Sequence, residues 1–135
     1  MIGIDTNILV RYVTQDDLHQ SALATDWIES HCTPSNRGWI NRIVLCELVW
    51  VLIRGYHYDK KEVIRLLERI LETESLAVES SDEARKALQS YCDGPADFSD
   101  YLLLQTNLSK KVRNTITFDR KAATHPGFKL LESKD

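Results

Sequence analysis

Short apolar runs alternate along this chain with longer segments in which apolar side chains recur at helical spacing. The short runs predict strands and the longer periodic segments predict helices. The predicted strands cover residues 1–4, 39–40, 76–78 and 112–118, with a short terminal piece at 128–131. The predicted helices cover residues 8–13, 17–31, 43–53, 59–72, 80–91 and 96–111. This alternation predicts an α/β fold with a mainly parallel sheet.

Two helices carry end signals that sharpen the prediction. The apolar segment 43–53 runs into Arg54 and Gly55, a basic last turn followed by a helix-stopping glycine. Asp59 precedes Glu62 by three residues, which is the spacing of a capping box at the start of the next helix. Asp93-Gly94-Pro95 interrupts the chain between the last two predicted helices.

Composition favours one soluble domain over residues 1–135. The chain has 43% hydrophobic and 27% charged residues, which is enough to bury a core, and no linker or repeat divides it. No apolar stretch reaches the ~18 to 20 residues that cross a bilayer, and no signal peptide is recognisable, so we expect a cytoplasmic protein. The three cysteines form no C-x-x-C pair and are expected as reduced thiols in or near the core.

Acidic residues follow the first and the last clear strands. Asp5 comes directly after the apolar run 1–4, and Asp119 comes after the run 112–118. The carboxyl ends of parallel strands are where open α/β sheets place ligand sites. The alternative role of Asp5 is to cap the next helix, and the alternative role of Asp119 is that of an ordinary turn residue.

Glu47 is the only polar residue within the apolar segment 43–53, so we expect it to be partly buried. A buried carboxylate must be protonated, paired with a base or bound to a cation. A salt bridge to Arg42, or a helix edge that faces water, is the alternative to the cation.

Asp97 and Asp100 stand three residues apart at the start of the helix predicted over 96–111. Acidic residues in a first turn are favoured by the helix dipole alone, so this pair needs no function. Carboxylates that converge repel one another unless a divalent cation neutralises them. An all-oxygen site selects Mg²⁺ or Mn²⁺, ions that act on phosphodiesters.

At this point the sequence resembles the PIN-domain ribonucleases, and within them the VapC-type toxins of toxin–antitoxin pairs. The matching segments, which span essentially the whole chain, are Ile4-Asp5-Thr6-Asn7, Glu47 in its apolar helix, Ala96-Asp97-Phe98-Ser99-Asp100, and Thr117-Phe118-Asp119. The resemblance implies a three-layer α/β/α sandwich with a central parallel sheet. It also implies a metal-dependent endoribonuclease.

By this resemblance Asp5, Glu47, Asp100 and Asp119 form the Mg²⁺ site, with Mn²⁺ as a possible substitute. Asp97 matches an additional acid of many members, and Asn7 and Thr117 match polar residues that support the site by hydrogen bonding. The resemblance further implies an RNA substrate, a cognate antitoxin and a homodimer. One departure is the bulky run Tyr101 to Leu104, where the family usually has small residues, and this bulk could alter helix packing.

RNA binding requires positive charge, and the whole chain has 17 basic against 20 acidic residues, a net charge of −3. Any RNA binding must therefore depend on a local patch of basic residues. The segment 110–121 supplies five cations against a single acid, and Arg11 lies near Asp5. A solvated helix end is the alternative reading of this segment. The predicted RNA-contacting residues are Arg11, Lys110, Lys111, Arg113, Arg120 and Lys121.

Three further alternatives stay open. A catalytically inactive PIN-like module would keep the fold and bind RNA or a protein, although no member of the acidic set is missing. A receiver or dehalogenase-like phosphotransfer domain would need a second acid beside Asp5 or two residues on, and position 7 is Asn. Trp27 and Trp50 are expected in the core, or else in a groove for a partner. The four histidines are expected at the surface.

Overall fold

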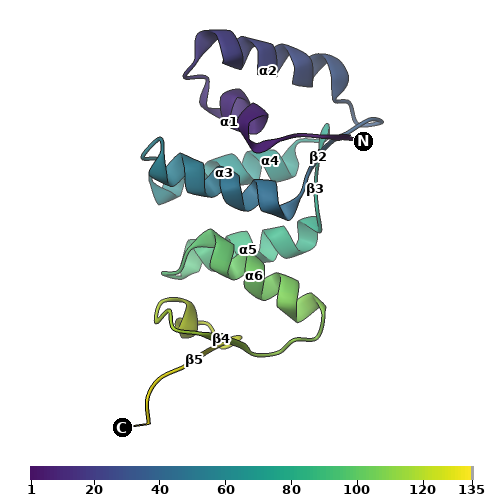
Figure 1. The fold of residues 1–135 in the computed structure, drawn as a ribbon. Coiled ribbons are helices and arrows are strands. Elements are labelled where there is room, and N and C mark those ends of the chain that lie inside the picture. Colours follow the sequence, from purple (N-terminus) through teal and green to yellow (C-terminus); the bar gives the residue numbers. More distant parts are fainter. Residues whose placement is uncertain (135) are drawn as a thin grey trace. The chain divides into compact units, whose positions relative to one another are not determined.

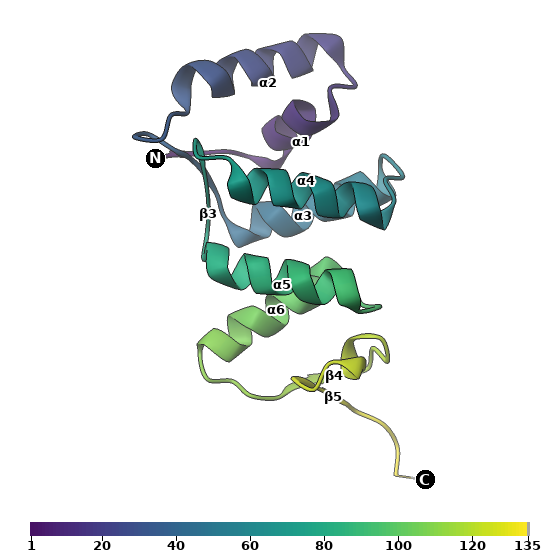
Figure 2. The same cartoon turned by 180° about the vertical axis from the view of Figure 1, so that it is seen from behind.

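The computed structural model describes residues 1–134, and the chain divides into two compact units, one of residues 1–81 and one that begins at residue 82. Figure 1 and Figure 2 show the elements from opposite sides. Every pairing between the strands of the described residues is parallel, and six helices accompany them. This confirms the predicted α/β class with parallel strands.

The first unit contains a three-stranded parallel sheet. Its strands are β1 (Ile2–Gly3), β2 (Gly38–Ile40) and β3 (Leu76–Val78), in the order β1-β2-β3. Gly38 of β2 is in register with Ile2 on one side and with Leu76 on the other. Ile40 is completely buried, so the central strand β2 carries part of the core of this unit.

Four helices accompany this sheet: α1 (Thr6–Thr14), α2 (Leu18–His31), α3 (Arg42–Arg54) and α4 (Lys60–Glu72). Helix α1 packs against both α2 and α3, and α4 contacts α3 and β3 (Figures 1 and 2). Each helix buries apolar side chains in this arrangement, although Leu18 and Leu23 of α2 stay exposed, and each buried Leu or Val contributes about 1.5–3 kcal/mol. The most deeply buried side chains are Leu9, Leu45, Leu48, Leu52, Val63 and Leu67.

The predicted capping box is present at the start of α4. The carboxylate of Asp59 accepts from the Glu62 N–H at 2.8 Å, and the Glu62 side chain accepts from the Asp59 N–H at 3.2 Å. Gly55 follows α3 as its C-cap, as the sequence predicts. These local signals fix where α3 ends and where α4 begins.

The second unit consists of two helices, a 3₁₀ turn and a parallel strand pair. In chain order they are α5 (Ser81–Asp93), α6 (Phe98–Ser109), β4 (Thr115–Thr117), η1 (Ala122–Thr124) and β5 (Phe128–Leu130). The Asn107 side chain donates to Thr115 Oγ1 at 2.9 Å, which ties the end of α6 to β4. The Tyr91 and Phe98 rings meet edge to face, which ties α5 to α6.

The bulky run after Asp100 fills the core of the second unit. Tyr101, Leu102 and Leu104 are each at most 3% exposed, and the Tyr101 hydroxyl accepts from the Ala96 N–H at 3.2 Å. A side chain at Gly94 would overlap with that hydroxyl, so glycine is required there by the close approach. The absence of a side chain at Gly94 therefore leaves room for the bulky Tyr101, where the family usually has a small residue.

Several local predictions are wrong. The strand predicted over 112–118 is limited to β4, and the helix predicted from residue 96 begins at Phe98. Cys92 is exposed and Trp50 is 62% exposed, so neither belongs to the core, whereas His125 is half-buried against Tyr101. Among residues 1–134, the helices are too short or too polar to span a bilayer.

Candidate acidic metal site

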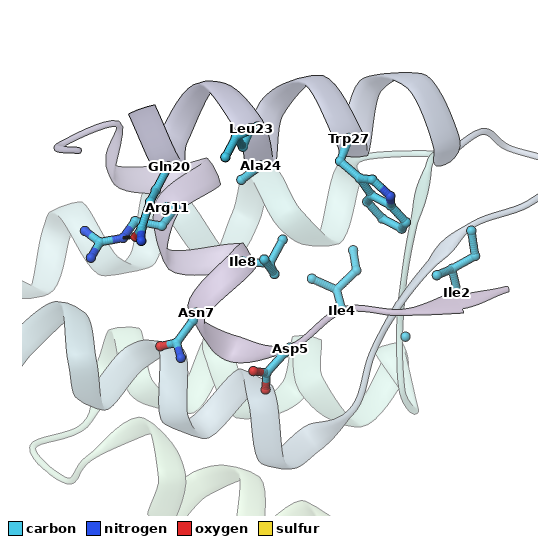
Figure 3. A pocket seen from close by; sticks show the side chains of 11 residues that line it. Ile2, Ile4, Asp5, Asn7, Ile8, Arg11, Gln20, Leu23, Ala24 and Trp27 are labelled. Carbon is cyan, nitrogen blue, oxygen red and sulfur yellow. Dashed lines mark hydrogen bonds between the residues drawn. The ribbon is translucent and has the colours of Figure 1, made fainter. Parts of the chain in front are cut away.

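Asp5 stands at the carboxyl end of β1 and at the N-cap of α1. The sequence places it there because the apolar run ends at Ile4, which is buried, and the helix begins at Thr6. The Asp5 side chain is exposed and makes no cap hydrogen bond to the helix. Figure 3 shows its carboxylate pointing away from α2, on the opposite side from Ile4 and Ile8.

The side chain of Asp5 makes no cap hydrogen bond, whereas the side chains of other N-cap residues in the same unit do. Asp17, Asn41 and Asp59 each accept a hydrogen bond from the amide three residues on, at 2.9, 2.9 and 2.8 Å. Capping is the usual role of an acid at this position. Asp5 therefore caps α1 through its backbone alone, since its carbonyl accepts from the Leu9 N–H at 3.2 Å, and its carboxylate is available to a cation.

Glu47 lies on α3 and reaches the first residue of α1. The Thr6 hydroxyl donates to Glu47 Oε1 at 3.0 Å. The expectation that Glu47 is partly buried is wrong, since the residue is exposed. Its neighbours Val44 and Val51, one turn away, do not enclose it, because the face that α3 buries consists of Val44, Leu45, Leu48, Val49 and Leu52.

Arg42, the predicted alternative partner of Glu47, pairs elsewhere. Its guanidinium lies 3.2 Å from Glu79 Oε2, and its backbone N–H donates to Glu79 Oε1 at 3.0 Å. Glu79 directly follows β3, and it was not singled out in the sequence although it occupies a strand end as Asp5 does. Arg42 thus compensates the charge of Glu79, and the hydrogen-bond partner of Glu47 is Thr6.

In the second unit, the charges of two other carboxylates act on Asp100. Asp100 is half-buried in the first turn of α6, and its pKa is raised. Burial is the largest cause, the N–H of Asp97 opposes it by donating to Asp100 Oδ2 at 3.3 Å, and the charges of Asp97 and Asp119 add to it. Asp97 is the N-cap of α6 and not part of its first turn, contrary to the prediction.

Asp119 shapes the turn after β4. Its Oδ1 accepts from the Lys121 N–H at 2.8 Å and from the Ala122 N–H at 3.1 Å. Its own N–H donates to Thr117 Oγ1 at 3.0 Å. Through Oδ1, Asp119 therefore has the role of a turn residue that was its predicted alternative. Among residues 1–134, no hydrogen bond engages Oδ2. Thr117 thus contacts the backbone of Asp119, and its role at a metal site stays a prediction.

The acidic set is therefore divided between the two units. The first unit supplies Asp5 and Glu47, and the second supplies Asp97, Asp100 and Asp119. Over residues 1–134, no three Asp, Glu, His or Cys side chains stand in a group that could hold a metal ion. The donor set itself fits a hard cation, because it consists of exposed or mutually repelling carboxylates.

In the first unit, the side chain that hydrogen-bonds to a predicted site acid is that of Thr6, which the sequence did not single out. Asn7 was predicted to support the site, but it is exposed and its side chain makes no hydrogen bond within the described residues. Figure 3 shows the Asn7 side chain on the same side of α1 as Asp5. The signal that could have found Thr6 is a hydroxyl at the first helical position beside an acid.

Arg11 is engaged within the first unit. Its guanidinium donates to both carboxylate oxygens of Asp16 at 3.1 Å, to Gln20 at 2.7 Å and to the Tyr56 hydroxyl at 3.1 Å. This network joins the end of α1 to the start of α2. Because its charge is compensated there, Arg11 is a weaker candidate for contact with RNA than the sequence indicated.

The other predicted cations lie outside such a network. All five are exposed on the segment from the end of α6 to the turn before η1. Among them, and within the described part of the chain, Arg120 alone forms an ion pair, with Glu132 at 3.7 Å, and both side chains are mostly exposed. A surface pair of this kind is weak, so the segment keeps its positive potential.

A pocket of about 640 Å³ opens beside Asp5 (Figure 3). Ile4, Ile8 and Trp27 face one another across it, and Leu23 of α2 lines it as well. Trp27 is 36% exposed, so it lies at the pocket and not within the core. Asp5 stands at the edge of this apolar hollow.

The profile of the PIN domain matches residues 2–127, and the chain belongs to the PIN-domain family. A relative named VapC ribonuclease, from Aquifex aeolicus (strain VF5), is 21% identical over 118 residues, which are 87% of this chain and 87% of that protein. No solved structure gives a significant match. The predicted family is confirmed, and its profile spans both compact units.

Proposed function

We propose that this protein is a Mg²⁺-dependent endoribonuclease of the VapC type. The observation that carries the proposal is Asp5, whose exposed carboxylate stands at the end of a parallel strand and makes no hydrogen bond to the helix that follows. Membership of the PIN family and the likeness to a VapC ribonuclease support it. The toxin of a toxin–antitoxin pair is the role that follows.

Asp5, Glu47, Asp100 and Asp119 would hold the metal. Part of this proposal is that the carboxylates of both units serve one site within a single domain, which the span of the family match supports. Burial, and to a smaller extent the charges of Asp97 and Asp119, raise the pKa of Asp100, and a bound cation would stabilise its ionised form. Asp97 would add negative charge to the site.

Cleavage requires water to attack phosphorus while the bond to the leaving oxygen breaks. When bound, Mg²⁺ would make that water more acidic and would stabilise charge on the phosphate. The carboxylates would hold the ion and accept the proton that the water loses. Thr117 and the turn amides at Lys121 and Ala122 hold Asp119 in one orientation.

The segment 110–121 would bind the RNA backbone. Lys110, Lys111, Arg113, Arg120 and Lys121 are exposed and surround Asp119 in sequence. Lys and Arg contacts to phosphates position a nucleic acid without reading its bases. The amides of the first turn of α1 have no side-chain cap, and they add a partial positive charge beside Asp5.

A protein partner belongs to the same proposal. A VapC-type toxin would be held inactive by a cognate antitoxin, and a homodimer would be its own assembly. Both rest on the likeness to the VapC ribonuclease. They are tested by co-expression with the neighbouring gene and by the mass of the purified protein in solution.

The experiment is cleavage of a mixed cellular RNA pool by the purified protein, with Mg²⁺ and with chelator. Asp5→Asn is expected to lose cleavage, and Asp59→Asn is the matched control, because Asp59 is an N-cap acid that does cap its helix. Mg²⁺-dependent cleavage by the wild type and by Asp59→Asn supports the proposal. RNA left intact by the wild type at all Mg²⁺ and Mn²⁺ concentrations would contradict it and favour a binding module.

A further inference from the structure

The hydroxyl of Thr6 has a partner that is distant in sequence. Thr73 and Thr106 each donate to the carbonyl four residues earlier, at 2.6 and 2.8 Å, and Thr14 donates to Asp16 two residues later at 2.8 Å. Thr6 is the first residue of α1 and has no helical turn before it. Its hydroxyl donates across 41 positions of sequence to Glu47 Oε1.

The two ends of this hydrogen bond have opposite environments. Thr6 is 7% exposed, whereas Glu47 is exposed on α3. An exposed glutamate has three rotatable bonds and samples many rotamers. The buried hydroxyl, fixed by the packing of α1 on α3, restricts that freedom and holds one oxygen of the carboxylate.

The hydrogen bond also determines which oxygen remains for a ligand. Thr6 engages Oε1, and within residues 1–134 no hydrogen bond engages Oε2 of Glu47. The backbone of Thr6 adjoins Asp5, so the same residue links the two acids of the first unit. A hydroxyl that orients a metal-binding carboxylate acts as an outer-shell partner of the ion.

We infer that Thr6 is a positioning residue that holds the Glu47 carboxylate for the divalent cation. This inference rests on the proposed function, since it assigns a role to Glu47 as a metal ligand. The Thr6 hydroxyl donates to Glu47, so Thr6 would act through that side chain. Losing the hydroxyl weakens metal binding and leaves the chemistry at saturating metal largely intact.

The test compares Thr6→Val, which removes the hydroxyl and keeps the shape, with Thr6→Ser, which keeps the hydroxyl. Mn²⁺ affinity is measured by electron paramagnetic resonance without RNA, and the half-saturating Mg²⁺ concentration is measured in RNA cleavage. Thr6→Val is expected to lower the Mn²⁺ affinity about tenfold and to raise the half-saturating Mg²⁺ concentration about tenfold. Thr6→Ser is expected to keep both values close to those of the wild type. Thr73→Val is the matched control and is expected to change neither.

A double substitution shows whether Thr6 acts through Glu47. In the Glu47→Ala background, Thr6→Val is expected to cause no further loss of Mn²⁺ affinity, because the shared interaction is already absent. Thr6→Ala replaces Thr6→Val in every arm if the valine variant does not fold. An undiminished effect of Thr6→Val in the Glu47→Ala background would overturn the inference, and so would wild-type affinity in Thr6→Val.

The outcomes separate this inference from the proposed function. A wild-type protein that binds no Mn²⁺ and cuts no RNA removes the proposed function, and the role of Thr6 with it. A wild-type protein that binds Mn²⁺ and cuts RNA, with Thr6→Val equal to it, removes the role of Thr6 alone. Equal losses in Thr6→Val and Thr6→Ser, with a lowered unfolding temperature, would identify Thr6 as a packing residue instead.

Discussion

The carboxylate of Asp119 disfavours ionisation of Asp100, although one follows strand β4 and the other lies in the first turn of α6. Burial is the largest cause of the raised pKa of Asp100, and the charges of Asp97 and Asp119 add to it against the Asp97 N–H. Negative charge from the end of the strand and from the N-cap of the helix thus adds to the burial that disfavours ionised Asp100. A cation bound to Asp100 would stabilise its ionised form.

Asp119→Asn tests this relationship. The substitution removes the repelling charge, so the pKa of Asp100 is expected to fall, as followed by carboxyl ¹³C NMR. Asn keeps an Oδ1 acceptor for the Lys121 and Ala122 amides, so the unfolding temperature is expected to stay nearly unchanged. Asp93→Asn on α5 is the control, and an unchanged Asp100 titration in Asp119→Asn would contradict the electrostatic account.

Salt dependence tests the role of the basic segment. Single-stranded RNA binding is measured in chelator by fluorescence anisotropy, over about 50–200 mM salt. Lys110→Gln with Arg113→Gln is expected to reduce the slope of log K against log salt by about 1.4, or about 0.7 for each lost phosphate contact. Lys61→Gln with Arg65→Gln, on exposed positions of α4, is expected to leave the slope unchanged. Equal effects of the two pairs would mean that the RNA contacts are not confined to this segment.

The close approach of Gly94 to Tyr101 predicts a large effect of a single methyl group. Gly94→Ala places that methyl against the Tyr101 hydroxyl, and overpacking of this kind costs about 1–3 kcal/mol in the free energy of unfolding. Gly3→Ala is the control, because a Cβ at Gly3 meets no atom within 4 Å. Urea unfolding measures both, and equal stability of the two variants would show that the loop at Gly94 yields without cost.

The network around Asp16 predicts a specific loss of stability in acid. The pKa of Asp16 is lowered from 3.8 to about 2, mainly by the hydrogen bond from Thr14. Burial opposes this by raising the pKa, and hydrogen bonds with Tyr56 and Arg11 lower it further. Because the folded-state pKa is the lower one, the ionised carboxylate stabilises the fold above about pH 4 and loses this contribution as the pH falls toward 2. The stability difference between wild type and Asp16→Asn is expected to shrink over that interval. A difference that is constant from pH 5 to pH 2 would exclude ionised Asp16 as its source.

Local signals in the sequence predicted much of this fold because they act over a few residues. The Asp59 and Glu62 capping box and the Gly55 stop are both present, and β3 occupies the predicted residues. The β4 strand is shorter than predicted, because β-branched composition extends beyond the residues that β5 pairs. Burial of Glu47 was predicted from its neighbours in sequence, whereas the face that α3 buries is set by its packing on α1 and α4.

The acids of the candidate site were all visible in the sequence, since a motif can be read position by position. The residues that hydrogen-bond to these acids or compensate nearby charges could not be predicted from the sequence in this way. The contact of Thr6 with Glu47 joins two helices that are distant in sequence, and the pairing of Arg42 with Glu79 depends on the β2 and β3 register. Tertiary packing decides such partners.

The most direct test of the central claim is whether acids of the two units hold the same cation. Mn²⁺ bound per protein is counted by electron paramagnetic resonance for the wild type, Asp5→Asn, Asp100→Asn and the double variant. The account predicts that each single substitution weakens the same binding by at least about tenfold and that the double variant is little worse than either. Two independent binding events, one lost with Asp5 and another lost with Asp100, would contradict it.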